Sequence, residues 1–350
     1  MARRLAQGAI LLVACGLLLF AWRCDGVWFE RHVFLPQQFF IPANRGIAGV
    51  FRVAAAMTAG ILLLAVPRIP RGAAGRGLLL GAILSLPAAE IVLRWRIEKV
   101  IRPELVSAMT HLTAPHPRYG ITFRPFLDRV EKLSAREIRF RTDGESRRIS
   151  GAAIDPALPS LVFTGESAMA GFGLRWEETF AALVGERLRL QVVNVASPAY
   201  RLDQSWLRLA DTLPELDRPA AVVGVFMPGL IGRALVPPSP NAWERSGLFR
   251  TWTHLYRSDG EIADGMRSVG AGLSKMAALA KQRGIPCVFL VTGYTPQWML
   301  HELFEAEGLD FVVVDLPQGE LLEDGHPGPR GSLRIAAALE SRLRTRLAHR

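Results

Sequence analysis

The chain has 350 residues, of which 50% are hydrophobic and 21% charged, and its mean hydropathy is +0.20. This hydropathy is high for a purely soluble domain and low for a transporter with many membrane helices, so it predicts a membrane portion joined to a water-soluble one. Most of the net charge of +10 lies in residues 1–100, which hold 12 Lys and Arg against 4 Asp and Glu. These cations flank apolar runs instead of alternating with aromatic residues, which excludes nucleic acid as the expected partner. The three cysteines form neither a disulfide framework nor a zinc-binding cluster.

Three apolar stretches within residues 1–98 have nearly the length that crosses a bilayer as a helix, and we expect each to be a transmembrane span. They are Leu5–Trp22, Gly46–Val66 and Gly77–Leu93. Arginines precede the first stretch and crowd the link between the second and the third. The positive-inside rule therefore places the N-terminus in the cytoplasm and everything after the third span outside. Arg52 and Glu90 lie inside two of the spans, where they would form an ion pair or extend to the membrane surface.

The rest of the chain divides near residue 158. Residues 99–158 have the pattern of a linker followed by lead-in strands, one of them at Glu137–Arg141. Residues 159–350 alternate short apolar strands with helical segments. The expected strands are Leu161–Thr164, Gln191–Val195, Ala220–Met227, Pro286–Thr292 and Asp310–Leu316. This alternation predicts a three-layer α/β domain with a doubly wound parallel sheet, whose functional residues gather beyond the carboxyl ends of the strands.

Two segments of this domain carry residues suited to nucleophilic catalysis. Ser167 follows the first strand in a glycine-rich turn, so its hydroxyl is expected at the carboxyl edge of the sheet, where backbone N–H groups can receive an oxyanion. His326 lies in a Gly/Pro-rich loop after the last strand, with Glu323 and Asp324 beside it. A serine in a turn is commonly a plain turn residue. A serine after the first strand combined with an acid–histidine turn after the last indicates a Ser–His–acid site.

These segments resemble the conserved blocks of the SGNH/GDSL hydrolases, especially of membrane-anchored bacterial members with a periplasmic SGNH domain. The family's Gly-Asp-Ser block is similar to Gly165–Ser167, its second block to Asn194–Tyr200 and its Asp-x-x-His-Pro block to Glu323–Pro327. The resemblance covers residues 115–350. It implies a flavodoxin-like SGNH fold, no cofactor and no metal, and a location at the bacterial inner membrane with the α/β domain in the periplasm. The implied activity is that of a serine esterase or O-acyltransferase acting on envelope glycans or lipid-linked esters.

The resemblance also implies a role for each site residue. Ser167 would be the nucleophile and His326 the general base, and the backbone N–H groups of Ser167 and Ala196 would bind the oxyanion. The acid is either Asp324 or Glu323. The family's spacing favours Glu323, whereas the residue type and the shorter side chain favour Asp324.

The chain departs from the family's pattern at three positions. Ala196 stands where the second block has its oxyanion-hole glycine, although it keeps its backbone N–H. Glu166 replaces the aspartate beside the nucleophile, and Leu230 stands where the third block has an oxyanion-binding asparagine. Loss of one oxyanion donor typically costs about 10²–10³ in rate. Two functions therefore stay open. The first is an esterase or acyltransferase, the latter needing a membrane partner that supplies the acyl donor. The second is a catalytically inactive scaffold or glycan-binding subunit of an envelope assembly.

Overall fold

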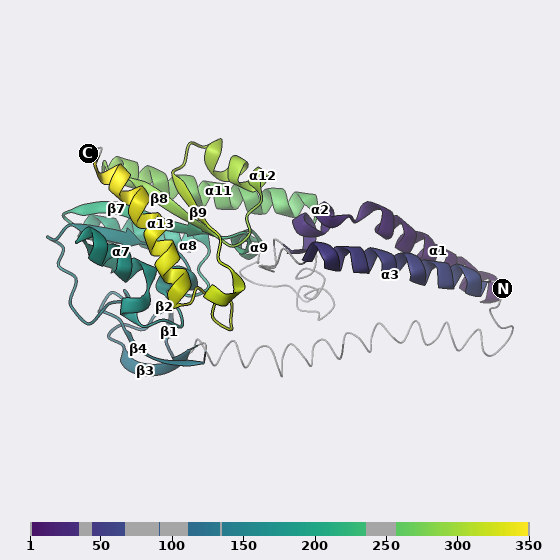
Figure 1. The fold of residues 1–350 in the computed structure, drawn as a ribbon, viewed down its shortest axis with the longest axis horizontal. Coiled ribbons are helices and arrows are strands. Elements are labelled where there is room, and N and C mark those ends of the chain that lie inside the picture. Colours follow the sequence, from purple (N-terminus) through teal and green to yellow (C-terminus); the bar gives the residue numbers. More distant parts are fainter. Residues whose placement is uncertain are drawn as a thin grey trace. The chain divides into compact units, whose positions relative to one another are not determined.

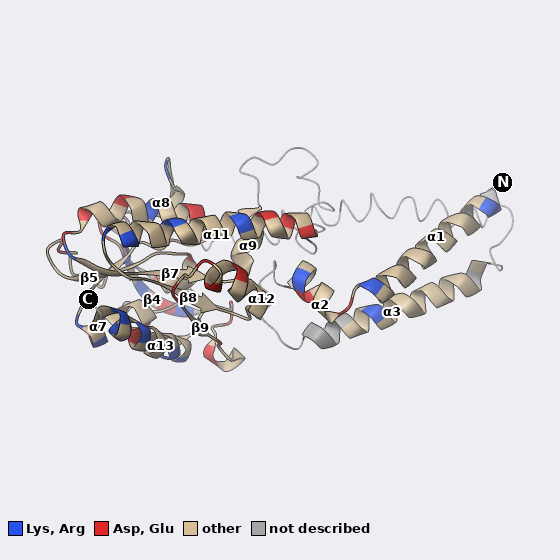
Figure 2. Cartoon of the chain, turned by 90° about the horizontal axis from the view of Figure 1, so that it is seen from above, with Lys and Arg blue, Asp and Glu red and all other residues tan. Residues whose placement is uncertain are grey.

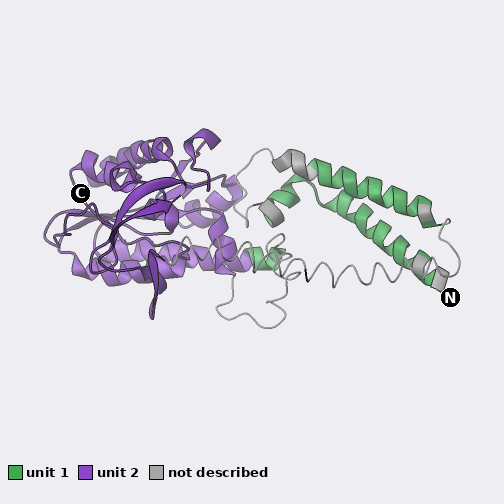
Figure 3. Ribbon diagram, turned by 90° about the horizontal axis from the view of Figure 1, so that it is seen from below, with its two compact units in different colours: residues 1–104, 237–262 green, residues 105–236, 263–350 purple. Residues whose placement is uncertain are grey.

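The structure is a computed structural model that describes residues 2–34, 44–66, 91, 111–133, 135–235 and 257–348. It consists of two compact units (Figure 3), formed by residues 1–104 with 237–262 and by residues 105–236 with 263–350. Residues 105–158, part of the expected linker and lead-in, thus belong to the same unit as the α/β sheet.

The first unit is helical. Its elements are α1 (Ala2–Arg23), α2 (Gly26–Phe29), the short π-helix η1 (Glu30–Phe34) and α3 (Asn44–Ala65). Helices α1 and α3 lie side by side (Figure 1). They coincide with the first two predicted spans, whereas the third lies outside the described residues except for Ile91. The Arg52 guanidinium donates a hydrogen bond from Nε to the carbonyl oxygen of Ala21 at 2.8 Å. The predicted partner Glu90 lies outside the described residues.

The described residues do not support the prediction of three transmembrane helices. Within them no single helix is long and apolar enough to cross a bilayer, whereas Gln7–Arg23 and Gly26–His32 together are, with a bend of 92° between them. The first helix ends at Arg23, and after the bend Asp25 caps the next helix by accepting the backbone N–H of Trp28 at 2.8 Å.

The second unit is built on a five-stranded parallel sheet, as predicted. Its strands run in the order β6-β5-β7-β8-β9. Each is a short apolar run bounded by turn residues, and all four residues of β5 are buried. The bounds are β5 Ser160–Phe163, β6 Gln191–Asn194, β7 Pro219–Phe226, β8 Cys287–Thr292 and β9 Phe311–Val314.

Helices cover both faces of this sheet, which confirms the predicted three-layer α/β architecture. Figure 2 shows α7 and α13 on one face and α8 and α11 on the other. The helices are α6 Ser167–Ala170, α7 Phe180–Leu188, α8 Leu202–Thr212, α9 Gly229–Ala234, α11 Asp259–Gln282, α12 Gln297–Leu300 and α13 Pro329–Ala348. Single turns of 3₁₀ or π-helix are η5 Trp176–Glu178, η6 Leu213–Glu215, η7 His301–Glu305 and η8 Gln318–Glu320.

Two antiparallel hairpins precede the sheet. The first pairs β1 (Thr113–His116) with β2 (Gly120–Phe123), and the second pairs β3 (Asp128–Leu133) with β4 (Arg136–Arg141). The predicted strand Glu137–Arg141 is part of β4. Beyond β4, Arg148 forms an isolated bridge with Asn194 at the end of β6, so the lead-in segment is joined to the sheet.

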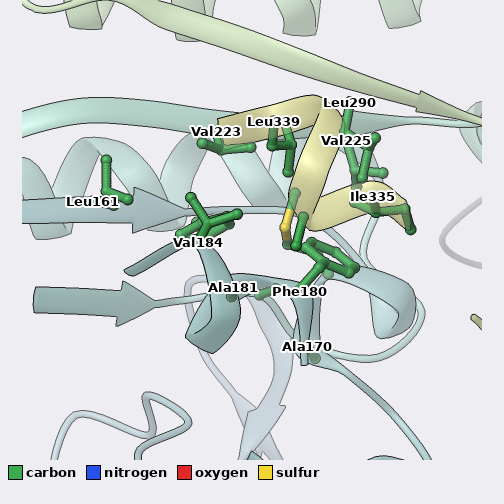
Figure 4. Packing of buried hydrophobic residues seen from close by; sticks show 14 of the residues in the cluster. Leu161, Ala170, Phe180, Ala181, Val184, Val223, Val225, Leu290, Ile335 and Leu339 are labelled. Carbon is green, nitrogen blue, oxygen red and sulfur yellow. The ribbon is translucent and has the colours of Figure 1, made fainter. Parts of the chain in front are cut away.

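The core between the sheet and the pair α7/α13 fixes the carboxyl end of β5. In Figure 4, Phe180 and Val184 of α7 and Ile335 of α13 pack with side chains of β7 and β8, among them Val225 and Leu290. Full burial of one such side chain contributes about 1.5–3 kcal/mol. The chain that leads from the carboxyl end of β5 to Ser167 is therefore held against this core.

Candidate active site

Ser167 stands on a tight turn directly after β5. Gly165 has φ +154°, and a Cβ there would lie 2.3 Å from Cγ1 of Val225, so only glycine fits. Glu166 caps α6, because its Oε1 accepts the N–H of Ala168 at 2.8 Å. Ser167 is the first residue of that helix. Its backbone N–H therefore has no acceptor within the helix.

The loop between η8 and α13 brings His326 to this serine. The N–H of Leu322 donates to the His326 carbonyl oxygen at 2.7 Å, and the N–H of Gly325 donates to the Leu322 carbonyl oxygen at 2.9 Å, which closes a tight turn. His326 Nε2 lies 2.8 Å from Ser167 Oγ, although 159 positions separate the two residues. The Phe172 ring lies 5.4 Å from the imidazole. The structure thus brings together the two residues predicted as nucleophile and base.

Asp324 is the carboxylate against the imidazole. Its Oδ2 lies 3.0 Å from His326 Nδ1, and its Oδ1 accepts the His326 backbone N–H at 3.2 Å. The approach to Nδ1 is close but is not aligned as a hydrogen bond, which is common in sites without substrate. Glu323 is exposed to solvent. Of the two acids left open by the sequence, the geometry places Asp324 at the ring.

The predicted second oxyanion donor is engaged within the protein. The Ala196 N–H donates to Asn194 Oδ1 at 3.1 Å, and Asn194 Nδ2 donates to the Met169 carbonyl oxygen at 2.9 Å. Leu230 is buried at the start of α9. An oxyanion role for Ala196 stays a prediction, since its N–H would have to exchange Asn194 for the substrate oxygen.

Two charged residues complete the surroundings of the nucleophile: Glu166, which the sequence analysis noted only as a departure from the family's pattern, and Arg233, which it did not name. Glu166 is 2% exposed, and its Oε2 accepts the Ser167 hydroxyl at 2.5 Å. Arg233 Nη1 lies 3.5 Å from that same Oε2 and donates to the Tyr200 carbonyl oxygen at 3.4 Å. Arg233 lies on α9, and no local pattern in the sequence indicated its contact with Glu166.

The charges around His326 favour its protonated form. Burial lowers the pKa of the imidazole, but the contact with Asp324 and the negative charges of Glu166 and Asp324 outweigh burial, so the pKa is raised. The cation of Arg233 opposes this rise. An imidazole with two carboxylates nearby is a strong proton acceptor, as a general base for a serine hydroxyl must be.

A buried arginine holds the segment that follows Ser167. Arg148 is fully buried and donates to the carbonyl oxygens of Ala170, Gly171 and Leu174, each at 2.5 Å. Burial lowers its pKa to about 9. Gly171 has φ +71°, and a Cβ there would lie 2.7 Å from the Arg148 guanidinium. No sequence pattern indicated this contact. Separately, no group of three or more His, Cys, Asp or Glu side chains is placed to hold a metal within the described part of the chain.

Comparisons with known proteins find likeness only among solved structures. No model of a protein family matches the chain, and no curated protein matches it. A protein from Desulfitobacterium hafniense assigned to the G-D-S-L lipolytic family is 17% identical, with a TM-score of 0.36 over 52% of this chain and 98% of that one. An acetyl xylan esterase from Butyrivibrio proteoclasticus is 14% identical, with a TM-score of 0.41 over 65% and 73%. A carbohydrate esterase of family 2 from Corynascus is 14% identical, with a TM-score of 0.38 over 56% and 69%. Likeness at this level carries no argument about the reaction of this chain.

Proposed function

We propose that the second unit is a serine esterase or O-acyltransferase of SGNH type. One observation carries the proposal: His326 Nε2 lies 2.8 Å from Ser167 Oγ, and Asp324 Oδ2 lies 3.0 Å from Nδ1 of the same ring. A bare hydroxyl, an imidazole and a carboxylate in this order are the parts of a nucleophilic triad. Ser167 lies 159 positions from His326, so chain proximity does not explain why the hydroxyl and the imidazole meet.

The mechanism follows from these positions. Ser167 Oγ attacks an ester carbonyl while His326 Nε2 takes the hydroxyl proton, and Asp324 stabilises the imidazolium. The oxyanion is received by the Ser167 N–H at the start of α6. His326 then gives its proton to the leaving alkoxide, which leaves an acyl group on Ser167. Attack by water completes hydrolysis, and attack by a sugar hydroxyl completes acyl transfer.

The substrate and location belong to the same proposal. The apolar faces of α1 and α3, together with the arginines that flank the predicted spans, favour attachment to a bacterial inner membrane with the α/β unit in the periplasm. A tethered esterase there would meet glycan or lipid-linked esters. An acyltransferase would also need a membrane partner that presents the acyl donor.

A second candidate is an inactive SGNH-like scaffold or glycan-binding subunit. It is favoured by the engagement of the Ala196 N–H with Asn194 and by Leu230 in place of a polar donor. Under this alternative the Ser–His contact would persist without turnover.

Labelling of the full-length protein with a fluorophosphonate decides between the two. The probe forms a phosphorus–oxygen bond to an activated serine and releases fluoride, and the serine proton passes to the base. We expect labelling of the wild type, none of Ser167→Ala, and a strong reduction in His326→Gln. A wild type that is folded but labels no faster than Ser167→Ala would favour the scaffold.

A further inference from the structure

The Ser167 hydroxyl has one hydrogen but two close partners. Glu166 Oε2 lies 2.5 Å from Oγ and His326 Nε2 lies 2.8 Å from it. A hydroxyl donates only one hydrogen bond, and an ionised carboxylate can only accept. If Ser167 donates to Glu166, the second contact needs a hydrogen on Nε2 that is donated to Oγ.

The other side of the ring imposes a second hydrogen. Asp324 Oδ2 lies 3.0 Å from Nδ1, and a carboxylate oxygen at that distance from a bare nitrogen lone pair would be repelled. An imidazole with hydrogens on both nitrogens is an imidazolium. It cannot accept the serine proton, so, with Ser167 donating to Glu166, the site holds one proton more than an active Ser–His pair needs.

Three charged groups from three elements face this pair. Glu166 comes from the β5–α6 turn, Arg233 from α9, and Asp324 from the loop of His326 itself. The aromatic neighbour Phe172 is neutral. Glu166 is almost fully buried, so its charge acts on the serine and the imidazole with little screening. Arg233 is the one cation of this set, and it contacts Glu166 directly.

We propose that Glu166 is a positioning residue that holds the Ser167 hydroxyl proton away from His326 in the resting site, and that Arg233 weakens this hold. The inference rests on the proposed nucleophilic role of Ser167. It gives the residue that replaces the family's aspartate a function of its own. The site becomes competent when one proton leaves, after which Ser167 can donate to a neutral His326.

Neutralising Glu166 and neutralising Arg233 should shift the pH at which His326 loses its proton in opposite directions. Glu166 stabilises the imidazolium, so its neutralisation lets His326 lose its proton at lower pH. Arg233 opposes the imidazolium, so its neutralisation lets His326 keep the proton to higher pH. In Glu166→Gln an amide oxygen remains to accept the Ala168 N–H, so the cap of α6 is kept. Glu166→Asp keeps the charge and serves as the matched control.

The test is the fluorophosphonate labelling rate of the full-length protein as a function of pH. Below the wild-type midpoint we expect Glu166→Gln to label roughly three- to tenfold faster than the wild type, with the two rates converging above it. Arg233→Gln should label more slowly than the wild type at the same acidic pH. The midpoint of the pH profile should lie closer to the wild-type value in Glu166→Asp than in Glu166→Gln. The proposal is overturned if Glu166→Gln lowers the labelling rate by the same factor at every pH and also lowers the melting temperature. Glu166 would then act only as a helix cap.

A second measurement does not depend on turnover. Ring-nitrogen NMR of protein labelled at histidine, with His326 assigned by the signal missing from His326→Gln, follows the imidazolium directly. The imidazolium form of His326 should persist to higher pH in the wild type than in Glu166→Gln. If the wild type never labels but this difference is seen, the proton arrangement stands and the enzymatic proposal fails. Equal titration in the two proteins overturns the proton arrangement whatever the labelling shows.

Discussion

Asp324 contacts the imidazole through a turn that contains only Gly325 between the two residues. Asp324→Asn keeps the shape but removes the charge that stabilises the imidazolium, so we expect the rate on an activated ester such as p-nitrophenyl acetate to fall by about 10²–10⁴. Glu323→Gln, which changes the exposed neighbour, should leave the rate within about twofold of the wild type. A larger loss in Glu323→Gln than in Asp324→Asn would reassign the acid.

Arg148 satisfies three carbonyl oxygens in the segment after Ser167 and stacks over the Phe140 ring at 4.5 Å. Arg148→Met leaves those buried carbonyls without a donor, and we expect a loss of about 2–4 kcal/mol in the free energy of unfolding. Urea unfolding of the full-length protein measures it. Arg139→Gln on β4, which removes an exposed pair with Asp128, should be nearly neutral. Equal effects of the two changes would contradict a supporting role for Arg148.

The site residues differ in how far the sequence could reveal them. Ser167 and His326 lie in segments whose glycines and prolines mark loops at strand ends, so topology alone predicted that they meet. The contact between Arg233 and Glu166 depends on where α9 leaves β7, and no local pattern encodes that position. Asn194 shows the same limit, because its bond to the Ala196 N–H depends on the path of the chain after β6.

At the scale of elements, the joint between β5 and α6 is the most constrained. Gly165→Ala would place a Cβ against Val225 on the neighbouring strand in a backbone region that side chains rarely adopt, so we expect a loss of at least about 2 kcal/mol in stability and of labelling at Ser167. Gly284 also has positive φ, but a Cβ there meets nothing within 4 Å. Gly284→Ala should therefore cost only about 1 kcal/mol. The comparison is made by thermal unfolding, and a smaller loss at position 165 than at 284 would refute it.

The strands were predictable to within one or two residues because each is a short apolar run bounded by turn formers. Helix ends were less predictable. The helical periodicity of Trp176–Leu190 predicts one helix, but the structure divides it, since Thr179 is extended and caps α7 by accepting the Ala182 N–H at 3.2 Å. The sequence pattern predicts a long helix over Asp264–Arg283, whereas α11 begins earlier, at Asp259, with acidic residues in its first turn.

At the scale of the whole molecule, the topology stays a prediction that rests on the arginines flanking the apolar stretches. If an odd number of spans precedes the α/β unit, alkaline phosphatase fused to the C-terminus should be active and a fluorescent protein fused there should be dark. A fluorescent fusion with inactive phosphatase would mean an even number of crossings.

The buried guanidinium of Arg148 also determines at which residue an expressed fragment of the chain can begin. A fragment that starts at residue 159 would contain the whole parallel sheet, yet it would lack the donor for Ala170, Gly171 and Leu174 and the partner of Asn194. A fragment that starts before β1 keeps both. The smallest fragment worth expressing for crystallisation therefore begins with the two hairpins, ahead of Thr113, and not at the first strand of the sheet.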